Sequence, residues 1–313
     1  MRMTLPGKPG LSAALLLLSL CGVAMAADRN AVPAKPPVPL LWKVSDADNS
    51  IYLLGSFHLL QTTDYPLAQE VDAAFADAET VLFEISPAEL QSPEMATKMA
   101  MAGMRTDGKR LQDDLDSQTW AALQAYARNN GLPLQSLSDF EPWMVGLTIS
   151  VMELSRQGLD PELGLDLHFA QAAAAANKPV SGLETGDEQI AALDGMDAGD
   201  QKQFLAEALD EAAKGSQEST RLHAAWRAGD AAGLLDGMAA EMKREYPRLY
   251  QRINVQRNDR WLPKLARLLD DSRDDDALVV VGALHLLGPD GVVEKLRAKG
   301  YRVERVCWAC KGE

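Results

Sequence analysis

The chain has 313 residues, of which 47% are apolar, 24% are charged and only 6% are aromatic. This length and apolar content exclude a disordered or collagen-like polymer and provide enough side chains for a large core. Lys and Arg number 31 against 45 Asp and Glu, which gives a formal net charge of -14. Because a negative field of this size repels phosphate backbones and anionic lipid surfaces, we expect no nucleic-acid partner and no polybasic membrane contact.

The first 26 residues are typical of a secretory signal peptide. Arg2 and Lys8 make the start basic, residues 11–23 are nearly all apolar, and residues 24–26 (Ala-Met-Ala) offer a small-residue cleavage site. The apolar run is too short for a comfortable membrane span, and no later stretch approaches about 20 apolar residues. We therefore expect cleavage after Ala26, no stable membrane span afterwards, and a periplasmic or secreted product.

The mature chain is predicted to consist of a tether and one domain. Residues 27–39 are polar and Pro-rich, which is typical of a linker, and residues 40–313 contain no second linker. Period-2 and short apolar runs predict strands near both ends of this domain, and helical spacing dominates between them. The predicted strands cover 40–44, 51–54, 81–84, 180–184, 277–281 and 301–306, and the predicted helices cover 67–78, most of 88–178 and of 186–275, and 291–299. We predict an α/β (α+β-like) fold with one central mixed sheet built from both ends of the chain and a large helical middle.

Two segments far apart in the sequence share one pattern. Residues 53–60 (LLGSFHLL) and 280–287 (VVGALHLL) each place Gly, two residues, His and two leucines after an apolar strand. With 23 glycines and 4 histidines, about 0.3 occurrences of Gly-x-x-His are expected by chance. If the two strands are neighbours, His58 and His285 lie at their carboxyl ends, where open α/β sheets place their sites. Their imidazoles should then lie within about 4 to 8 Å of each other, close enough to share an ion or an ion and its water.

The alternative is that both histidines are hydrogen-bonded core residues in a duplicated strand and turn. Composition and spacing do not separate this structural role from a metal site. Two histidines need a carboxylate to complete a useful hydrolytic centre. Glu84 and Glu184 each end a predicted strand, where an acid is either exposed or buried with a partner. Two acids and two histidines at the ends of strands form a more specific constellation than any one of them.

A polar pair, Arg257 and Asn258, precedes Trp261 in a segment with helical spacing. The sequence alone favours a solvated helix face with Trp261 packed inward.

Cys307 and Cys310 are the only thiols left after cleavage of the signal peptide. In an oxidising compartment they are candidates for a terminal disulfide. A redox motif is a weaker interpretation, because only three residues follow and such motifs normally begin a helix.

Together these motifs resemble the TraB/GumN family, which includes the Tiki proteins and bacterial pheromone-shutdown proteins. The resemblance extends from about residue 38 to about residue 306. It rests on the two Gly-x-x-His motifs, Phe83-Glu84, the run 182–185 (GLET), Arg257-Asn258 before Trp261, and the run 281–291 (VGALHLLGPDG). A shorter match lies at Gly164-x-Asp166.

The resemblance implies a metal-dependent site. Tiki relatives are regarded as metal-dependent proteases that trim an N-terminal segment from a secreted protein, with manganese or cobalt as the ion; zinc also suits these donors. Carried over to this sequence, the metal ligands are His58, His285 and Glu84, and the catalytic candidates are Glu84, Glu184, Arg257 and Asn258.

The function predicted from these residues is that of an exported metal-dependent hydrolase acting on a peptide or an envelope protein. A divalent ion would polarise the scissile carbonyl, and a second acid would act as general base. The alternative is a non-catalytic periplasmic binder that sequesters a peptide or an envelope component. Both use the same fold, so only turnover separates them.

Overall fold

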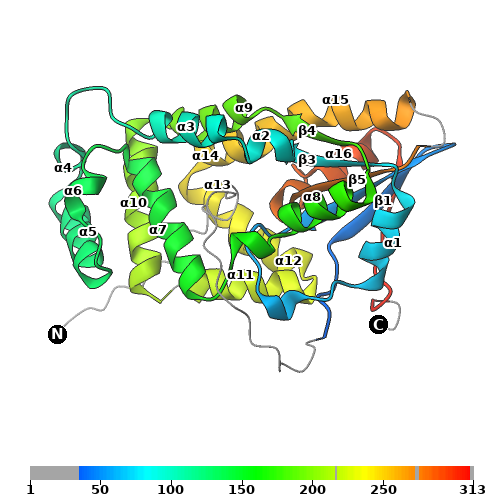
Figure 1. Cartoon of the computed structure of the whole chain (residues 1–313), viewed down its shortest axis with the longest axis horizontal. Coiled ribbons are helices and arrows are strands. Elements are labelled where there is room, and N and C mark those ends of the chain that lie inside the picture. Colours follow the sequence, from blue (N-terminus) through cyan, green and yellow to red (C-terminus); the bar gives the residue numbers. More distant parts are fainter. Residues whose placement is uncertain (1–34, 216, 272–274, 311–313) are drawn as a thin grey trace.

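The computed structural model describes residues 35–215, 217–271 and 275–310. The predicted signal peptide and most of the predicted tether lie outside the described residues. Within them, a six-stranded sheet in the order β4-β3-β5-β2-β1-β6 is surrounded by helices (Figure 1). The strands are β1 (Leu41–Ser45), β2 (Ser50–Ser56), β3 (Thr80–Ile85), β4 (Val180–Glu184), β5 (Ala277–Gly282) and β6 (Arg302–Arg305).

The α-helices lie mostly between β3 and β5 in the sequence. They are α1 (Gln69–Asp77), α2 (Pro87–Leu90), α3 (Pro93–Ala102), α4 (Leu111–Asp114), α5 (Ser117–Asn129), α6 (Leu134–Leu137), α7 (Pro142–Arg156), α8 (Leu165–Ala176), α9 (Gly186–Asp194), α10 (Ala198–Ala213), α11 (Gln217–Ala228), α12 (Ala231–Leu234), α13 (Glu241–Glu245), α14 (Pro247–Tyr250), α15 (Gln256–Asp270) and α16 (Val292–Ala298). The predicted mixed sheet from both chain ends and the large helical middle are thus confirmed.

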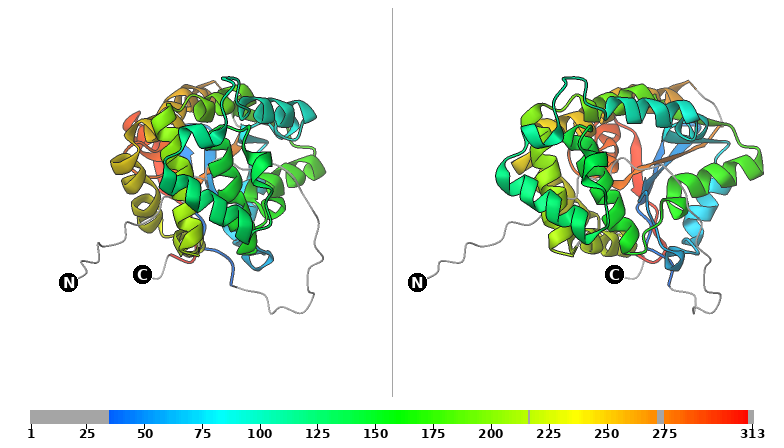
Figure 2. Two further views of the ribbon diagram at one scale, coloured as in Figure 1. Left: turned by 90° about the vertical axis from the view of Figure 1, so that its left-hand side faces the viewer. Right: turned by 60° about the vertical axis from the view of Figure 1, so that its left-hand side comes forward.

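The connections place helices on both faces of the sheet. Strands β4, β3, β5 and β2 are parallel, whereas β1 forms antiparallel pairs with β2 and β6. Helices α1 and α8 precede β3 and β4, so their connections run toward the β4 edge of the sheet. Helices α15 and α16 precede β5 and β6, so their connections run toward the β6 edge. Right-handed crossovers therefore place the first two helices on one face of the sheet and the last two on the other (Figure 2). Because β2 and β5 are covered on both faces, every residue of these strands is buried.

Part of the helical middle has an apolar cluster of its own. Helices α5, α7 and α10 lie together at the end of the molecule away from the sheet (Figure 1). Their shared cluster includes Leu123, Ile149 and Leu205, all at most 1% exposed. The sheet and the site described below belong to the other, larger cluster.

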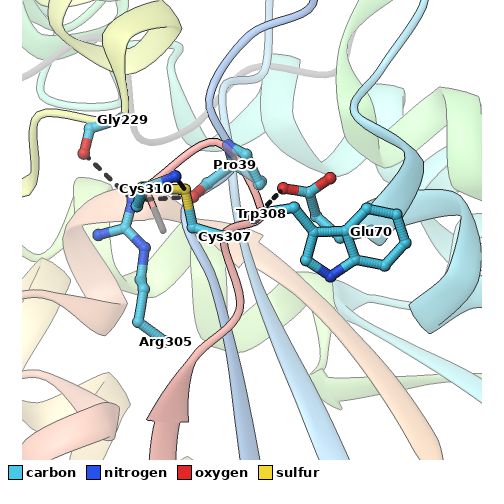
Figure 3. The surroundings of a disulfide bond; sticks show 7 residues. All are labelled: Pro39, Glu70, Gly229, Arg305, Cys307, Trp308 and Cys310. Atoms are coloured by element: carbon cyan, nitrogen blue, oxygen red, sulfur yellow. Dashed lines mark hydrogen bonds between the residues drawn. A yellow bond between two sulfur atoms is a disulfide. The ribbon is translucent and has the colours of Figure 1, made fainter. Parts of the chain in front are cut away.

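The loop after β6 lies beside the first helix of the fold. Cys307 and Cys310 form a disulfide in the loop after β6, and the backbone N–H of Trp308 between them donates a 2.8 Å hydrogen bond to Glu70 of α1 (Figure 3). Two hydrogen bonds from Arg305 attach β6 to the carbonyls of Pro39 and Gly229.

Among the helices in the described part of the chain, none combines the length and apolar character needed to cross a membrane.

Candidate metal and catalytic site

The two Gly-x-x-His motifs lie side by side at the carboxyl ends of parallel neighbours, β2 and β5. His58 follows β2, and His285 lies in the 3₁₀ turn Ala283–Leu286 that follows β5. Gly55 permits this close approach, because a β-carbon there would lie 3.2 Å from the Cα of Ala283. The strands are therefore neighbours, as the duplicated pattern requires for a shared site.

Glu84, in the next strand β3, faces both histidines. Its Oε1 lies 3.9 Å from Nε2 of His58 and 3.9 Å from Nε2 of His285. The two Nε2 atoms are thus no more than twice that distance apart, which is within the upper limit expected for a shared ion. The same oxygen accepts a 2.8 Å hydrogen bond from the backbone N–H of Gly282.

Gly282 keeps the space beside His58 and Glu84 open. A β-carbon at this position would lie 3.2 Å from both Oε1 of Glu84 and Nε2 of His58. Nine in ten real β-carbon contacts are longer than this, so a side chain at Gly282 would displace His58 or Glu84 by a few tenths of an ångström. The glycine of the second motif is therefore part of the site as well as of the turn.

His58 is oriented by a carboxylate to which the sequence motifs assigned no role. Its Nδ1 lies 2.7 Å from Oδ2 of Asp166, and its Nε2 is buried without a hydrogen-bond partner. Burial alone would lower the pKa of His58, and Arg257 acts in the same direction. The charge and hydrogen bond of Asp166, together with Glu84, outweigh both and raise the pKa of His58 to about 9. This environment favours positive charge at Nε2, whether from a proton or from a metal ion.

Asp166 reaches His58 because α8 begins directly against the loop after β2. Gly164 is the N-cap of α8, and a β-carbon there would lie 2.0 Å from the carbonyl oxygen of His58. Only glycine tolerates this contact between backbones. Asp166 then lies in the first turn of α8, where the helix dipole favours a negative charge.

His285 has the opposite electrostatic environment. Its Nδ1 lies 2.7 Å from Oδ1 of Asn258, and its Nε2 lies 3.0 Å from Nη1 of Arg257. Because the guanidinium can only donate, Nε2 accepts and the proton is on Nδ1, facing the amide oxygen. Burial, then Arg257 and then His58, hold the pKa of His285 well below its usual value. The ring is therefore neutral, and it lies 4.5 Å from the ring of Trp261.

Arg257 is a fully buried cation at the centre of the site. It lies in the first turn of α15 and donates to Glu84 on β3 and to Glu184 on β4. The pKa of Arg257 is raised because the two carboxylates outweigh burial. One helical turn later, Trp261 packs its ring 4.8 Å from the guanidinium. The solvated helix face that the sequence alone favoured is not observed, because both Arg257 and Asn258 are 0% exposed.

Glu184 is held more tightly than Glu84. Both oxygens accept from Nε of Arg257, at 3.0 and 3.1 Å, and one also accepts from the indole N–H of Trp261 at 3.1 Å. The amide of Gln189 lies within 3.4 Å of both carboxylates. Burial raises the pKa of Glu184, and the donors from Arg257 and Trp261 limit the rise.

The structure brings all six sequence-predicted site residues together: His58, Glu84, Glu184, Arg257, Asn258 and His285. The motifs gave no role to three further residues: Asp166, which orients His58; Gln189, which bridges the carboxylates; and Trp261, which covers Arg257 and binds Glu184. The Gly164-x-Asp166 match was the only signal for the first. No sequence pattern marked Gln189, and Trp261 was expected only as a packing residue.

The donor types fit a divalent transition-metal ion. An unpartnered imidazole nitrogen on His58, a carboxylate oxygen on Glu84 and a second imidazole on His285 form a His₂Glu set of the kind used in catalytic metal sites. The two buried carboxylates Glu84 and Glu184, together with the partly buried Asp166, also outnumber the guanidinium of Arg257. Across residues 35–215, 217–271 and 275–310, however, no three His, Cys, Asp or Glu side chains form a metal-binding group as they stand. In this state Nε2 of His285 is hydrogen-bonded to Arg257.

A family model for the TraB/PrgY/gumN family matches residues 40–305. The chain is 25% identical over 259 residues to the uncharacterized protein YbaP of Escherichia coli (strain K12). The alignment covers 79% of this chain and 87% of YbaP. The Shigella flexneri protein of that name gives the same values. It is 23% identical over 321 residues to the metalloprotease TIKI1 of Danio rerio, which covers 84% of this chain and 62% of TIKI1. No solved structure gives a significant match.

Proposed function

Because the chain belongs to the TraB/PrgY/gumN family, we propose that it is an exported metal-dependent hydrolase that cleaves peptides or envelope proteins. Its similarity to a protein named as a metalloprotease suggests hydrolysis and metal dependence. The observation that carries the proposal is the buried, unpartnered Nε2 of His58, which faces Oε1 of Glu84 beside a glycine that leaves room for an ion.

His58, Glu84 and His285 are the residues that would hold the ion. Manganese or cobalt is the ion implied by the resemblance, and zinc suits the same donors. When bound, such an ion polarises a scissile carbonyl and lowers the pKa of a coordinated water. The charge balance of the site supports this, because an ion would neutralise the carboxylates that Arg257 alone leaves in excess.

The remaining residues of the site position these groups and control protons. Asp166 pairs with Nδ1 of His58 and so keeps Nε2 directed toward Glu84, where an ion would replace the proton that the raised pKa of His58 favours. Asn258 accepts the Nδ1–H of His285 and is itself fixed by a 2.8 Å hydrogen bond from its amide to the carbonyl of Asp290. Glu84 turns Oε1 toward both histidines, where it would hold the ion, and Oε2 toward Arg257. The second predicted acid, Glu184, has a positioning role: it accepts hydrogen bonds from Arg257 and Trp261 and so fixes these two side chains.

The test is hydrolysis of a peptide library by the purified mature chain, followed by mass spectrometry. We expect cleavage after loading with Mn²⁺ or Co²⁺, loss of cleavage on chelation, and loss in the His58→Ala and His285→Ala variants. His168→Ala is the matched control, because His168 lies on α8 and contacts Tyr65 and Phe169 rather than the site. Binding of peptides without cleavage by any loaded form would instead indicate the non-catalytic binder.

A further inference from the structure

The hydrogen bonds of Arg257 divide into two groups. On one side, Nε pairs with both oxygens of Glu184, and Nη1 donates to the carbonyl of Ile253 at 3.2 Å, with Trp261 stacked beside the guanidinium. On the other side, Nη1 donates to Nε2 of His285 and Nη2 donates to Oε2 of Glu84. The second group uses atoms of two of the three residues expected to bind the ion.

We propose that Arg257 is a displaceable internal cation that competes with the metal ion for Glu84 and His285, and that Glu184 is its permanent counter-ion rather than a metal ligand. This inference rests on the proposed metal site and adds the control of its occupancy. Metal binding requires the bond from Arg257 to Nε2 of His285 to break, whereas the bond to Glu84 is on Oε2, the oxygen other than the one that faces the histidines, and competes with the ion for the charge of this carboxylate. The bonds to Glu184 and to Ile253 need not change.

The contacts around Glu184 explain why Arg257 would remain in place. The side-on pairing of Nε with Oε2 and of Nη2 with Oε1 of a carboxylate is among the strongest arrangements available to arginine. Trp261 donates to the same carboxylate from α15, so both oxygens of Glu184 already accept hydrogen bonds from α15. After displacement, Arg257 and Glu184 form a neutral pair, and the ion takes over the charge of Glu84.

The same arrangement explains why the site tolerates the absence of an ion. Glu84 and Glu184 are 5% and 4% exposed, and two buried carboxylates without a cation would be strongly destabilising. Arg257 supplies that cation. Without Arg257, the stability of the fold should depend on a metal ion to neutralise the two carboxylates. The loss of Arg257 should also free Nε2 of His285 to bind the ion.

The test is isothermal titration of the mature chain with Mn²⁺ alone, without a substrate. We expect Arg257→Gln to bind Mn²⁺ at least about tenfold more tightly than the unaltered chain and to gain more thermal stability from the ion. Arg257→Lys retains the charge and lacks the fork, so it should lie between the two and serves if the glutamine variant does not fold. Arg260→Gln is the matched control, because Arg260 is exposed on the same helix and the charge change is identical; its affinity should not change.

A double variant separates the two roles of Glu184. If Glu184 only anchors Arg257, Arg257→Gln with Glu184→Gln binds Mn²⁺ as tightly as Arg257→Gln alone; if it binds the ion, the double variant is weaker and the proposal is wrong. Folded Arg257 variants that bind Mn²⁺ no more tightly than the unaltered chain also contradict it, as does absence of binding in all forms. Peptide cleavage is not measured, so a failure of the hydrolase proposal alone leaves these results unaffected.

Discussion

Asp166 lies 2.7 Å from Nδ1 of His58, although 108 residues separate them in the sequence. The pairing fixes the orientation of the His58 ring and leaves Nε2 directed toward Glu84. A carboxylate behind a ligating histidine orients the ring and raises its basicity. Asp166 is therefore a positioning residue of the proposed site.

Replacing Asp166 by Asn should weaken metal binding. The amide preserves the size of the side chain but removes the charge that supports His58, so we expect the affinity for Mn²⁺ to fall by about 10- to 100-fold. Isothermal titration of the folded variant measures this. Asp72→Asn, at an exposed position of α1, is the matched control; an equal affinity in both variants would show that Asp166 has no positioning role.

Gly282→Ala should abolish the site without unfolding the chain. Its β-carbon would lie 3.2 Å from His58 Nε2 and from Glu84 Oε1, so these groups must move apart. We expect loss of Mn²⁺ binding and of hydrolysis, with circular dichroism unchanged. Gly199→Ala, in the exposed first turn of α10, is the control. Retained ion binding by Gly282→Ala would mean that the ion lies elsewhere.

Acid should destabilise the chain partly through Asp64. This buried residue accepts hydrogen bonds from His223, Arg227 and the backbone of Gln61. Burial alone would raise the pKa of Asp64, but these donors outweigh it and lower the pKa below its usual value. The stabilisation is therefore complete above the unfolded pKa of about 3.9 and is lost as the pH falls through the lower, folded pKa.

Asp64→Asn tests this relationship. We expect a loss of about 1.5–3 kcal/mol near neutral pH, because hydrogen bonds to a charged group are removed. The further loss on acidification should be smaller than in the unaltered chain. Urea unfolding at about pH 7 and about pH 3 measures both. The same dependence on pH in the two proteins would exclude Asp64 as a source of acid sensitivity.

The disulfide between Cys307 and Cys310 should contribute little to global stability. It closes a loop of only a few residues, so constraint of the unfolded chain provides about 2 kcal/mol. Replacing both cysteines by Ser should lower the free energy of unfolding by no more than this and leave metal binding intact. Urea unfolding and Mn²⁺ titration check the two statements. A loss of metal binding would show that the terminal loop supports the site.

Local patterns were sufficient to predict the strands and the residues that follow them. Apolar runs located β2, β3, β4 and β5. Because these strands are parallel, their carboxyl ends lie together, and these ends carry the four residues His58, Glu84, Glu184 and His285. Each of these residues lies at or just beyond the end of its strand. Its place in the site therefore depends on strand order more than on details of packing.

The other residues depend on how helices pack, which no local pattern contains. Asp166 lies in an Ala-rich helix and reaches His58 only because Gly164 lets α8 begin against the loop after β2. Arg257 is buried in the first turn of α15, which follows the π-helical turn Gln251–Val255 and packs against β2 and β4. A charged residue with helical spacing is usually exposed, so the sequence favoured the opposite environment.

The most direct test of the proposed site is X-ray absorption spectroscopy of the mature chain loaded with Mn²⁺ or Co²⁺. We predict scattering from two imidazoles together with carboxylate oxygen, and from one imidazole in the His285→Ala variant. A spectrum without imidazole scattering, or one that is unchanged in His285→Ala, would contradict a metal site built from the two Gly-x-x-His motifs.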